Sequence, residues 1–221
     1  MTNSSDWLES TYSAQQIGEL ISRVLDFTND KNSLQSFKNA LAYYIAATVD
    51  VDAHLQASLP ISGLQLLTYY TFVTTGPHTP KQWEKLVPKN RGTEWEVRQL
   101  LDKMQISISI PTHFQHLAAV AQQMAKNGAS RDALGVVIKM RNVATHPTKQ
   151  QSGDYTVYAW AEAGMLARYW LCLALLYTVG YQGDVAAVMQ PRPRQPGETR
   201  GTPWTQISGQ PWRVGDGPDE T

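Results

Sequence analysis

The sequence predicts an all-α fold, a bundle of helices followed by an irregular tail. Over most of residues 1–189 apolar side chains recur three and four positions apart, which is the spacing of a single helix face. Beyond Met189 the composition changes, because half of the chain's twelve prolines fall in residues 190–221 together with five glycines. Such a segment cannot build a packed core. We therefore predict a helical domain over residues 1–189 and a Pro/Gly-rich tail over residues 190–221.

Apolar periodicity and capping residues indicate the first three helices. The first begins after Ser13 as N-cap, and its apolar face consists of Ile17, Leu20, Ile21, Val24 and Leu25. The second is capped by Asn32 or Ser33. The third begins at about Pro60, because proline is favoured in a first helical turn, and it ends at Val73 ahead of a Gly-Pro pair.

The later elements follow from the same signals. The Thr79-Pro80 pair opens a fourth helix, and Thr93 and Ser130 are capping residues at the starts of two others. The remaining two helices are expected to begin at about residues 112 and 156. The helix that begins at residue 112 ends before Gly128, and the long final helix ends at Gly180. Residues 105–110 alternate isoleucine with small polar residues, but a strand needs a partner, so the pattern predicts an extended connector.

Composition limits the class of protein. The formal net charge is zero, so the whole surface is not that of an electrostatic nucleic-acid binder. The single cysteine, Cys172, excludes an internal disulfide and lies in an apolar helix, where a buried structural thiol is expected. Residues 165–179 are apolar but shorter than the roughly 20 residues that a bilayer needs. With no basic-then-apolar leader pattern, we expect a cytoplasmic protein without a membrane partner.

Arg141 interrupts the apolar stripe of the helix that begins at Ser130. Leu134, Val137 and Ile138 are spaced as one helix face, and Arg141 continues that face where an amphipathic helix ordinarily carries an aliphatic residue. A guanidinium cannot lose its proton, so its burial without a partner is costly. The position therefore requires a carboxylate, a phosphate or a wet cleft on this face.

Two further polar residues lie at the end of the same helix. Asn142 and His146 are four residues apart and project together, while Pro147 biases the backbone of His146 out of the α region. A cation, an amide and a titratable imidazole are the groups that a metal-free enzyme uses on a phosphodiester. The surroundings are basic, with the single acid Asp132 set against Arg131, Lys139, Arg141 and Lys149. We take Lys139 and Lys149 as candidate substrate-binding residues.

The string Arg141-Asn142-x-x-x-His146 resembles the RNxxxH signature of HEPN domains, small all-α modules of prokaryotic defence and toxin–antitoxin systems. Two other stretches are similar to the Apea-like branch of this superfamily, namely residues 40–47 with the apolar run 59–73, and the last helix over residues 167–181. The resemblance spans about residues 31–183, and its specific part is the RNxxxH segment.

The resemblance implies a metal-independent endoribonuclease that works without a cofactor. In such an enzyme His146 is the general acid or base for attack by the ribose 2′-hydroxyl, and Arg141 binds the scissile phosphate. Asn142 positions either His146 or the phosphate. It also implies an RNA substrate, a homodimer with facing motif helices, and an antitoxin or regulatory partner. Thr148 stands where toxins silenced by AMP transfer carry tyrosine, so that form of control is not implied.

Other interpretations remain open from the sequence alone. The domain can be a HEPN-like module that binds RNA, a nucleotide or a protein without turnover, or a piece of a larger protein. Arg141 can be neutralised by Glu162 or Asp102, and His146 can serve as a helix C-cap. His113 and His116 are three apart on one helix, but no third metal ligand stands near them, so no metal site is predicted.

Overall fold

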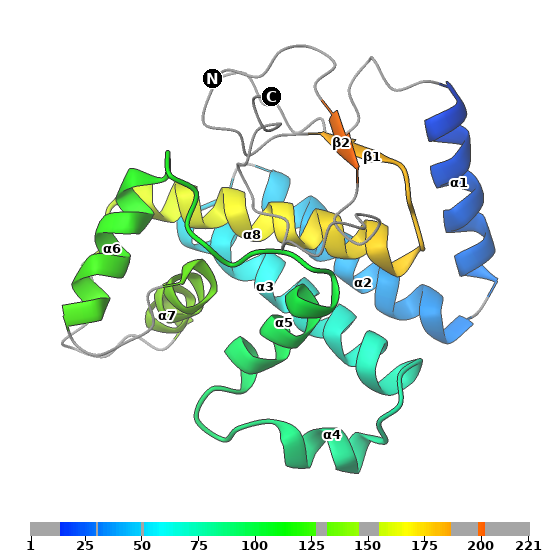
Figure 1. The fold of residues 1–221 in the computed structure, drawn as a ribbon, viewed down its shortest axis with the longest axis horizontal. Helices are drawn as coiled ribbons and strands as arrows, with labels where there is room; N and C mark the ends of the chain where they lie inside the picture. The colour runs from blue at the N-terminus through cyan, green and yellow to red at the C-terminus, as the bar shows by residue number, and fades with distance from the viewer. Residues whose placement is uncertain are drawn as a thin grey trace, which may run out of the picture.

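The computed structural model describes residues 14–29, 31–49, 51–126, 132–145, 155–186 and 199–201. Within these residues the chain forms eight α-helices, one π-helical turn and one pair of short strands (Figure 1). The predicted all-α bundle is confirmed. In this part of the chain, no helix is both long and apolar enough to cross a lipid bilayer.

The elements follow one another with short connections. In chain order the helical elements are α1 (Ala14–Thr28), α2 (Lys31–Thr48), α3 (Ala53–Tyr69), the π-helical turn η1 (Tyr70–Thr74), α4 (Pro80–Leu86), α5 (Gly92–Lys103), α6 (Gln115–Lys126), α7 (Ala133–Thr145) and α8 (Val157–Thr178). Strand β1 (Asp184–Ala186) then pairs antiparallel with β2 (Thr199–Gly201). The pair brings three residues of the predicted tail back to the end of α8, and the other tail residues lie outside the described ranges.

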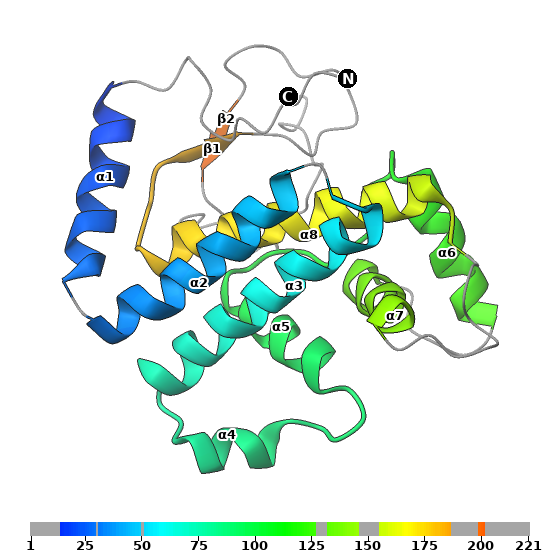
Figure 2. The same ribbon diagram turned by 180° about the vertical axis from the view of Figure 1, so that it is seen from behind.

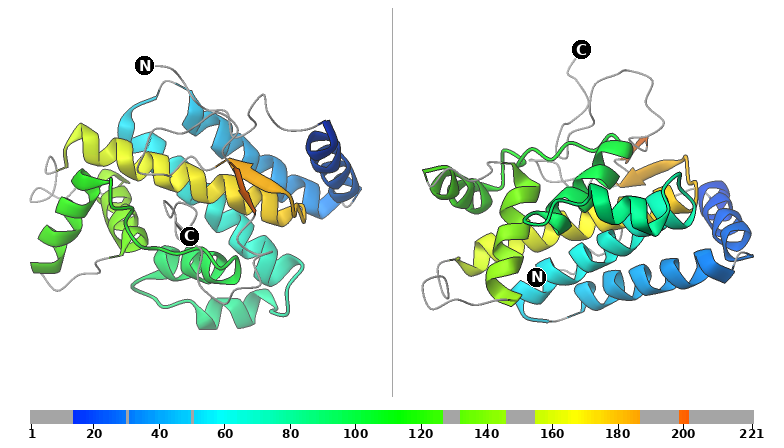
Figure 3. Two further views of the ribbon diagram at one scale, coloured as in Figure 1. Left: turned by 45° about the horizontal axis from the view of Figure 1, so that its top comes forward. Right: turned by 90° about the horizontal axis from the view of Figure 1, so that it is seen from below.

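Helices α3 and α8 form the centre of the bundle. Helix α3 packs against α2, α5, α7 and α8, and α2, α3 and α8 run alongside one another when the molecule is seen from behind or from below (Figures 2 and 3). Helix α8 is buried on nearly every side, and Trp170 in its middle has no exposed surface. An apolar stretch of this length is therefore a core helix, as the sequence predicts.

Two glycines allow α3 and α8 to approach closely. A Cβ atom on Gly63 of α3 would lie 2.8 Å from a methyl carbon of Leu171, and one on Gly164 of α8 would lie 3.2 Å from the Cβ of Gln56. At such distances a larger side chain would push the two backbones apart. These glycines are thus packing residues inside helices rather than helix breakers.

Several predicted helix starts are wrong. Helix α3 begins at Ala53 and includes Pro60, which is buried inside it rather than in its first turn. Burial against α2 and α8 favours this longer helix even though proline removes one backbone hydrogen bond. Asn32 and Ser33 lie inside α2, which begins at Lys31. Thr93 lies inside α5, where its hydroxyl accepts a hydrogen bond from Gln65 at 3.1 Å.

Other local predictions are confirmed. Thr79 caps α4 with a reciprocal capping box, and Thr156 caps α8 by accepting a hydrogen bond from the Ala159 N–H. Gly180 ends α8 with φ +70°, a left-handed conformation that glycine adopts without strain. Residues 105–110 are a connector, as predicted.

Other predictions at helix ends differ from the structure or lie outside it. Helix α6 begins at Gln115 instead of residue 112. The predicted caps Ser13 and Ser130 and the stop at Gly128 lie outside the described residues.

Candidate functional site

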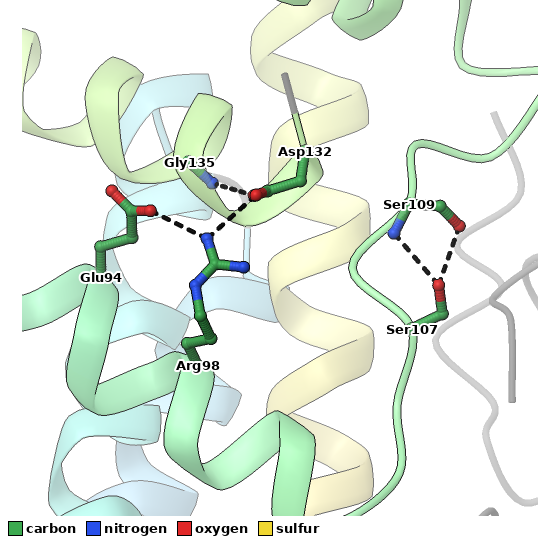
Figure 4. Close-up of polar contacts among 6 residues, drawn as sticks. All are labelled: Glu94, Arg98, Ser107, Ser109, Asp132 and Gly135. Carbon is green, nitrogen blue, oxygen red and sulfur yellow. Dashed lines mark hydrogen bonds and ion pairs between the residues drawn. The ribbon is translucent and has the colours of Figure 1, made fainter. Parts of the chain in front are cut away.

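The N-terminus of α7 is held by a carboxylate that the sequence analysis did not assign a role. Asp132 Oδ1 accepts a hydrogen bond from the Gly135 N–H at 2.8 Å, so Asp132 caps the helix. Its other oxygen, Oδ2, lies 3.0 Å from Nη2 of Arg98 on α5, and the same nitrogen is 2.8 Å from Oε1 of Glu94 (Figure 4). A half-buried network of three charges thus joins α5 to the start of α7.

The connector before α6 also contacts the start of α7. The carbonyl of Ile108 accepts a hydrogen bond from the Ala133 N–H at 2.8 Å. The connector is itself stabilised by Ser107 and Ser109, whose hydroxyl oxygens are 3.0 Å apart (Figure 4). The first turn of α7 is therefore fixed by backbone and side-chain hydrogen bonds together.

The pKa of Arg98 follows from this arrangement. Burial alone lowers the pKa of the Arg98 guanidinium, but the hydrogen bonds and negative charges of Glu94 and Asp132 outweigh burial and raise it above its usual value. Arg98 is a fixed cation whose two partners belong to the fold. Since Asp132 is used in this way, it does not neutralise the basic groups at the far end of α7.

The body of α7 is buried on several sides. Leu134, Val137 and Ile138, which define the predicted stripe, are all buried, as are Met140 and Val143 near the C-terminal end. The helix packs against α3, α5, α6 and α8. The end of the helix is therefore anchored in the core, and a side chain attached there has a defined position.

Arg141 is half-buried and has no carboxylate partner among the described residues. Its Nε is buried and makes no hydrogen bond, and its Nη1 donates to Oδ1 of the neighbouring Asn142 at 3.3 Å. No salt bridge within the described ranges includes it. The sequence predicts an ionic or wet environment at this position, and no carboxylate of the described residues serves as counter-ion to the guanidinium.

The neighbours of Arg141 at the helix end are polar and exposed. Asn142 and Lys139 are exposed, and Thr145 donates its hydroxyl proton to the carbonyl of Arg141 at 3.1 Å. Arg141, Asn142 and Lys139 are thus brought together at the last turns of one helix. The other two predicted site residues, His146 and Lys149, lie outside the described residues, as does Arg131.

The two carboxylates considered as internal partners of Arg141 have other environments. Glu162 on α8 accepts hydrogen bonds from the Leu117 N–H at 2.6 Å and the His116 N–H at 3.4 Å, and so caps α6. Burial raises the pKa of Asp102, and the charge of Arg98 partly opposes that effect. Neither forms an ion pair with Arg141 in the part of the chain that the structure describes.

His113, just before α6, and His116, in its first turn, both make aromatic contacts. His116 stacks on Tyr158 with ring centroids 5.0 Å apart, and His113 packs edge-on against Phe114. Burial lowers the pKa of His113, although the charge of Glu162 acts in the opposite direction. These ring contacts pack around the N-terminus of α6. Within the described ranges no group of three metal-binding side chains is found.

Arg168 is a second half-buried cation, and its charge lies near the C-terminus of α2. Its Nη1 lies 3.4 Å from the carbonyl oxygen of Ala47 in the last turn of α2, where the helix dipole favours positive charge. Burial lowers the pKa of Arg168, and nearby Tyr44 opposes this. Beside them, burial raises the pKa of Cys172 to about 12, so this residue is the inert thiol that the sequence predicts.

The structure thus defines a class, an all-α bundle with an arginine near the end of a core helix that pairs with no carboxylate of the described residues. A family model, that of the YopA C-terminal domain, matches residues 30–198. The chain belongs to this family. The match begins at α2, so α1 precedes it, and it contains the whole of α7. No curated protein and no solved structure matches the chain.

Proposed function

We propose that this protein is a metal-independent endoribonuclease of the HEPN type. The observation that carries the proposal is the state of Arg141. Its guanidinium stands at the end of a core helix, its Nε is buried without a hydrogen-bond partner, and no carboxylate pairs with it among the described residues. A half-buried cation of this kind is stabilised when an external anion accepts hydrogen bonds from its unpaired N–H groups.

A phosphodiester is the anion that best suits the residues beside Arg141. The planar guanidinium can bind two phosphate oxygens at once, which a lysine cannot do. Asn142 already contacts the guanidinium through its amide oxygen, and its exposed position leaves the amide nitrogen available to a bound phosphate. Lys139, three residues before Asn142 and exposed, adds positive charge for a neighbouring phosphate.

The proposed chemistry is a transesterification within the RNA chain. The 2′-oxygen attacks the adjacent phosphorus, a new P–O bond forms, and the bond to the 5′-oxygen breaks. His146 follows directly on α7, and an imidazole with an ordinary pKa of about 6.5 can take the 2′-hydroxyl proton or protonate the leaving 5′-oxygen. Arg141 offsets the negative charge that accumulates on the phosphoryl oxygens in the transition state.

The assembly that we propose is a homodimer in which the ends of two α7 helices face one another across the RNA cleft. A regulatory or antitoxin partner and a cytoplasmic role in prokaryotic defence complete the proposal. Equilibrium sedimentation of the purified chain tests the dimer directly. A monomer at all accessible concentrations would contradict this part of the proposal while leaving the chemistry of Arg141 to be tested separately.

The decisive experiment is RNA cleavage by the purified chain in excess EDTA. The parent is compared with His146→Ala and with a matched control, His116→Ala, in which an exposed histidine outside the site is removed. We expect the parent and the control to leave 2′,3′-cyclic phosphate ends, and His146→Ala to be slower by about 10²- to 10⁴-fold. Circular dichroism establishes that all three are folded.

A second candidate function is RNA binding without turnover. It needs only groups that bind phosphate, and Arg141, Asn142 and Lys139 at the end of α7 are of that kind. Fluorescence anisotropy with a labelled RNA separates the two candidates. The binding module is correct, and the nuclease is not, if three results hold together. The folded parent binds RNA, the Arg141→Ala variant binds RNA more weakly, and the parent cleaves no RNA in the presence or absence of EDTA.

A further inference from the structure

A pocket of about 650 Å³ lies on a part of the bundle remote from the RNxxxH sequence. It forms where η1 and the C-terminal ends of α5 and α8 meet, and no residue of α7 lines it. The side chains that define its chemistry are Tyr70, Thr71, Thr75, Lys103, Tyr177 and Thr178. The sequence gives no sign of it, because its residues come from three elements that are distant along the chain.

The wall contributed by η1 is a rigid backbone feature. The Thr75 N–H and the Thr75 hydroxyl both donate to the carbonyl of Tyr70, at 3.0 and 3.1 Å, and the His78 N–H donates to the carbonyl of Phe72. A Cβ atom on Gly76 would lie 2.4 Å from the carbonyl oxygen of Thr71, so no larger residue fits there. Single π-helical turns of this kind often occur at functional sites.

Lys103 supplies the single charge among the residues that line the pocket. It lies in the last turn of α5, and its Nζ is 5.7 Å from the centre of the Phe72 ring, a cation–π distance. No salt bridge in the described part of the chain includes it. An anionic group on a ligand can therefore pair with this ammonium without displacing an internal carboxylate.

The helix ends around the pocket limit how much negative charge it accepts. The C-termini of α5 and α8 direct carbonyl groups toward this region, although cap hydrogen bonds such as that from the Tyr181 N–H to the Leu176 carbonyl satisfy them. The remaining partial negative charge opposes multiply charged anions. One lysine beside two helix C-termini is therefore best matched by a ligand with a single negative charge.

The other polar groups of the pocket are hydroxyls. Thr178 donates to the Ala174 carbonyl at 2.7 Å, which leaves its oxygen lone pairs as acceptors. Thr71 contributes another hydroxyl group. Burial raises the pKa of Tyr177, so its phenol remains protonated at neutral pH. Such a lining hydrogen-bonds to a hydroxylated ligand, while the aromatic face of Tyr70 contacts its carbon skeleton.

We propose that this pocket binds a small hydroxylated monocarboxylate, a ligand of the sugar-acid class, with its carboxylate on Lys103 and its hydroxyls on the threonine side chains. The site is independent of Arg141 and of the proposed nuclease activity. It would give this bundle a small-molecule site in addition to the proposed site at the end of α7.

The test uses gluconate as the probe and sorbitol as its uncharged counterpart. In amide NMR titrations of the full chain, we expect saturable shifts at Thr71, Gly76 and Tyr177 with gluconate and at least about fivefold weaker binding of sorbitol. Lys103→Met should weaken gluconate binding by a similar factor. The matched control Lys85→Met removes an exposed lysine from the last turn of α4, outside the pocket, and should leave binding unchanged.

Three results would overturn the proposal. They are the absence of saturable gluconate shifts in the folded parent, equal binding of gluconate and sorbitol, and equal loss of binding in Lys103→Met and Lys85→Met. Lys103→Arg keeps the charge and should retain most of the affinity, so a folding defect of the methionine variant is recognised. RNA cleavage by the same proteins is measured separately and does not bear on this result.

Discussion

Two arginines near opposite ends of α7 have contrasting surroundings. Arg98, beside the N-terminus, shares one nitrogen between Glu94 and Asp132 at 2.8 and 3.0 Å. Arg141, near the C-terminus, contacts only the amide oxygen of Asn142 through Nη1, and its buried Nε has no hydrogen-bond partner among the described residues. The first cation is neutralised by two carboxylates of the fold, whereas the second has no carboxylate partner in the part of the chain that the structure describes.

The two environments differ in their expected cost. The Arg98 guanidinium has two carboxylates as counter-charges, and these join α5 to the start of α7. A half-buried guanidinium that pairs with no carboxylate among the described residues is a cost to the folded state. Substitutions of Arg98 therefore serve as controls for substitutions of Arg141.

The largest expected effect is on RNA cleavage. Arg141→Ala removes the group proposed to stabilise the phosphoryl transition state and should lower the cleavage rate by about 10²- to 10³-fold. Arg98→Met should leave the rate per folded molecule close to that of the parent, because Arg98 is occupied by internal carboxylates. Single-turnover cleavage of a labelled RNA measures both. Similar losses in the two variants would remove the distinction between the arginines.

The next effect is on stability. Arg98→Met leaves Glu94 and Asp132 without their cation and should lower the free energy of unfolding by about 1–2 kcal/mol, a value reduced by the partial exposure of all three groups. Arg23→Met breaks the exposed 4.0 Å pair with Glu19 and should cost less than about 0.5 kcal/mol. Urea unfolding monitored by circular dichroism gives both values. An equal cost for the two variants would mean that the Arg98 network does not stabilise the fold.

Asp132 combines a cap with an ion pair, and two substitutions separate them. Asp132→Asn keeps an N-cap oxygen for the Gly135 N–H but loses the charge that faces Arg98. Asp132→Ala loses both and should be less stable than the asparagine variant by about 1 kcal/mol. Urea midpoints at equal m-values measure the difference. Identical stabilities would show that the cap contributes nothing.

A smaller effect of opposite sign is expected at Arg141. Arg141→Met retains most of the apolar stem and removes the buried Nε, so it should raise the free energy of unfolding by about 0.5–1 kcal/mol while abolishing RNA binding or cleavage. The same urea experiment measures the gain, and anisotropy measures the loss. A destabilised Arg141→Met protein would indicate that the guanidinium has an internal role.

The smallest effect concerns pH. Burial raises the pKa of Asp102 above its usual 3.8, against the influence of Arg98. Between the unfolded and folded pKa values the folded protein holds an extra proton, so its stability falls as pH rises through this range. Asp102→Asn removes this penalty, so its gain in stability relative to the parent should grow as pH rises above 3.8 through the titration of Asp102 and then stay constant, and it should be larger in an Arg98→Met background. A gain independent of pH would exclude the titration of Asp102 as its cause.

The sequence predicted part of the site. Spacing alone identified Arg141 as a cation on an apolar stripe, and α7 indeed buries Leu134, Val137 and Ile138. It missed the pairing of Arg98 with Asp132, because these residues are 34 positions apart and only packing brings α5 to the start of α7. The connector at residues 105–110 was recognised, but not the hydrogen bond from Ala133 to Ile108 that makes it a support for the helix.

By itself the sequence determined the all-α class, the helix starts at Thr79-Pro80 and at about Thr156, and the stop at Gly180, because periodicity, helix-start signals and glycine conformation act over a few residues. Only the tertiary structure decided that α3 extends through Pro60, that η1 and Lys103 share a pocket, and which arginine near α7 is neutralised. Those outcomes depend on contacts between distant segments, and local patterns carry no information about which segments meet.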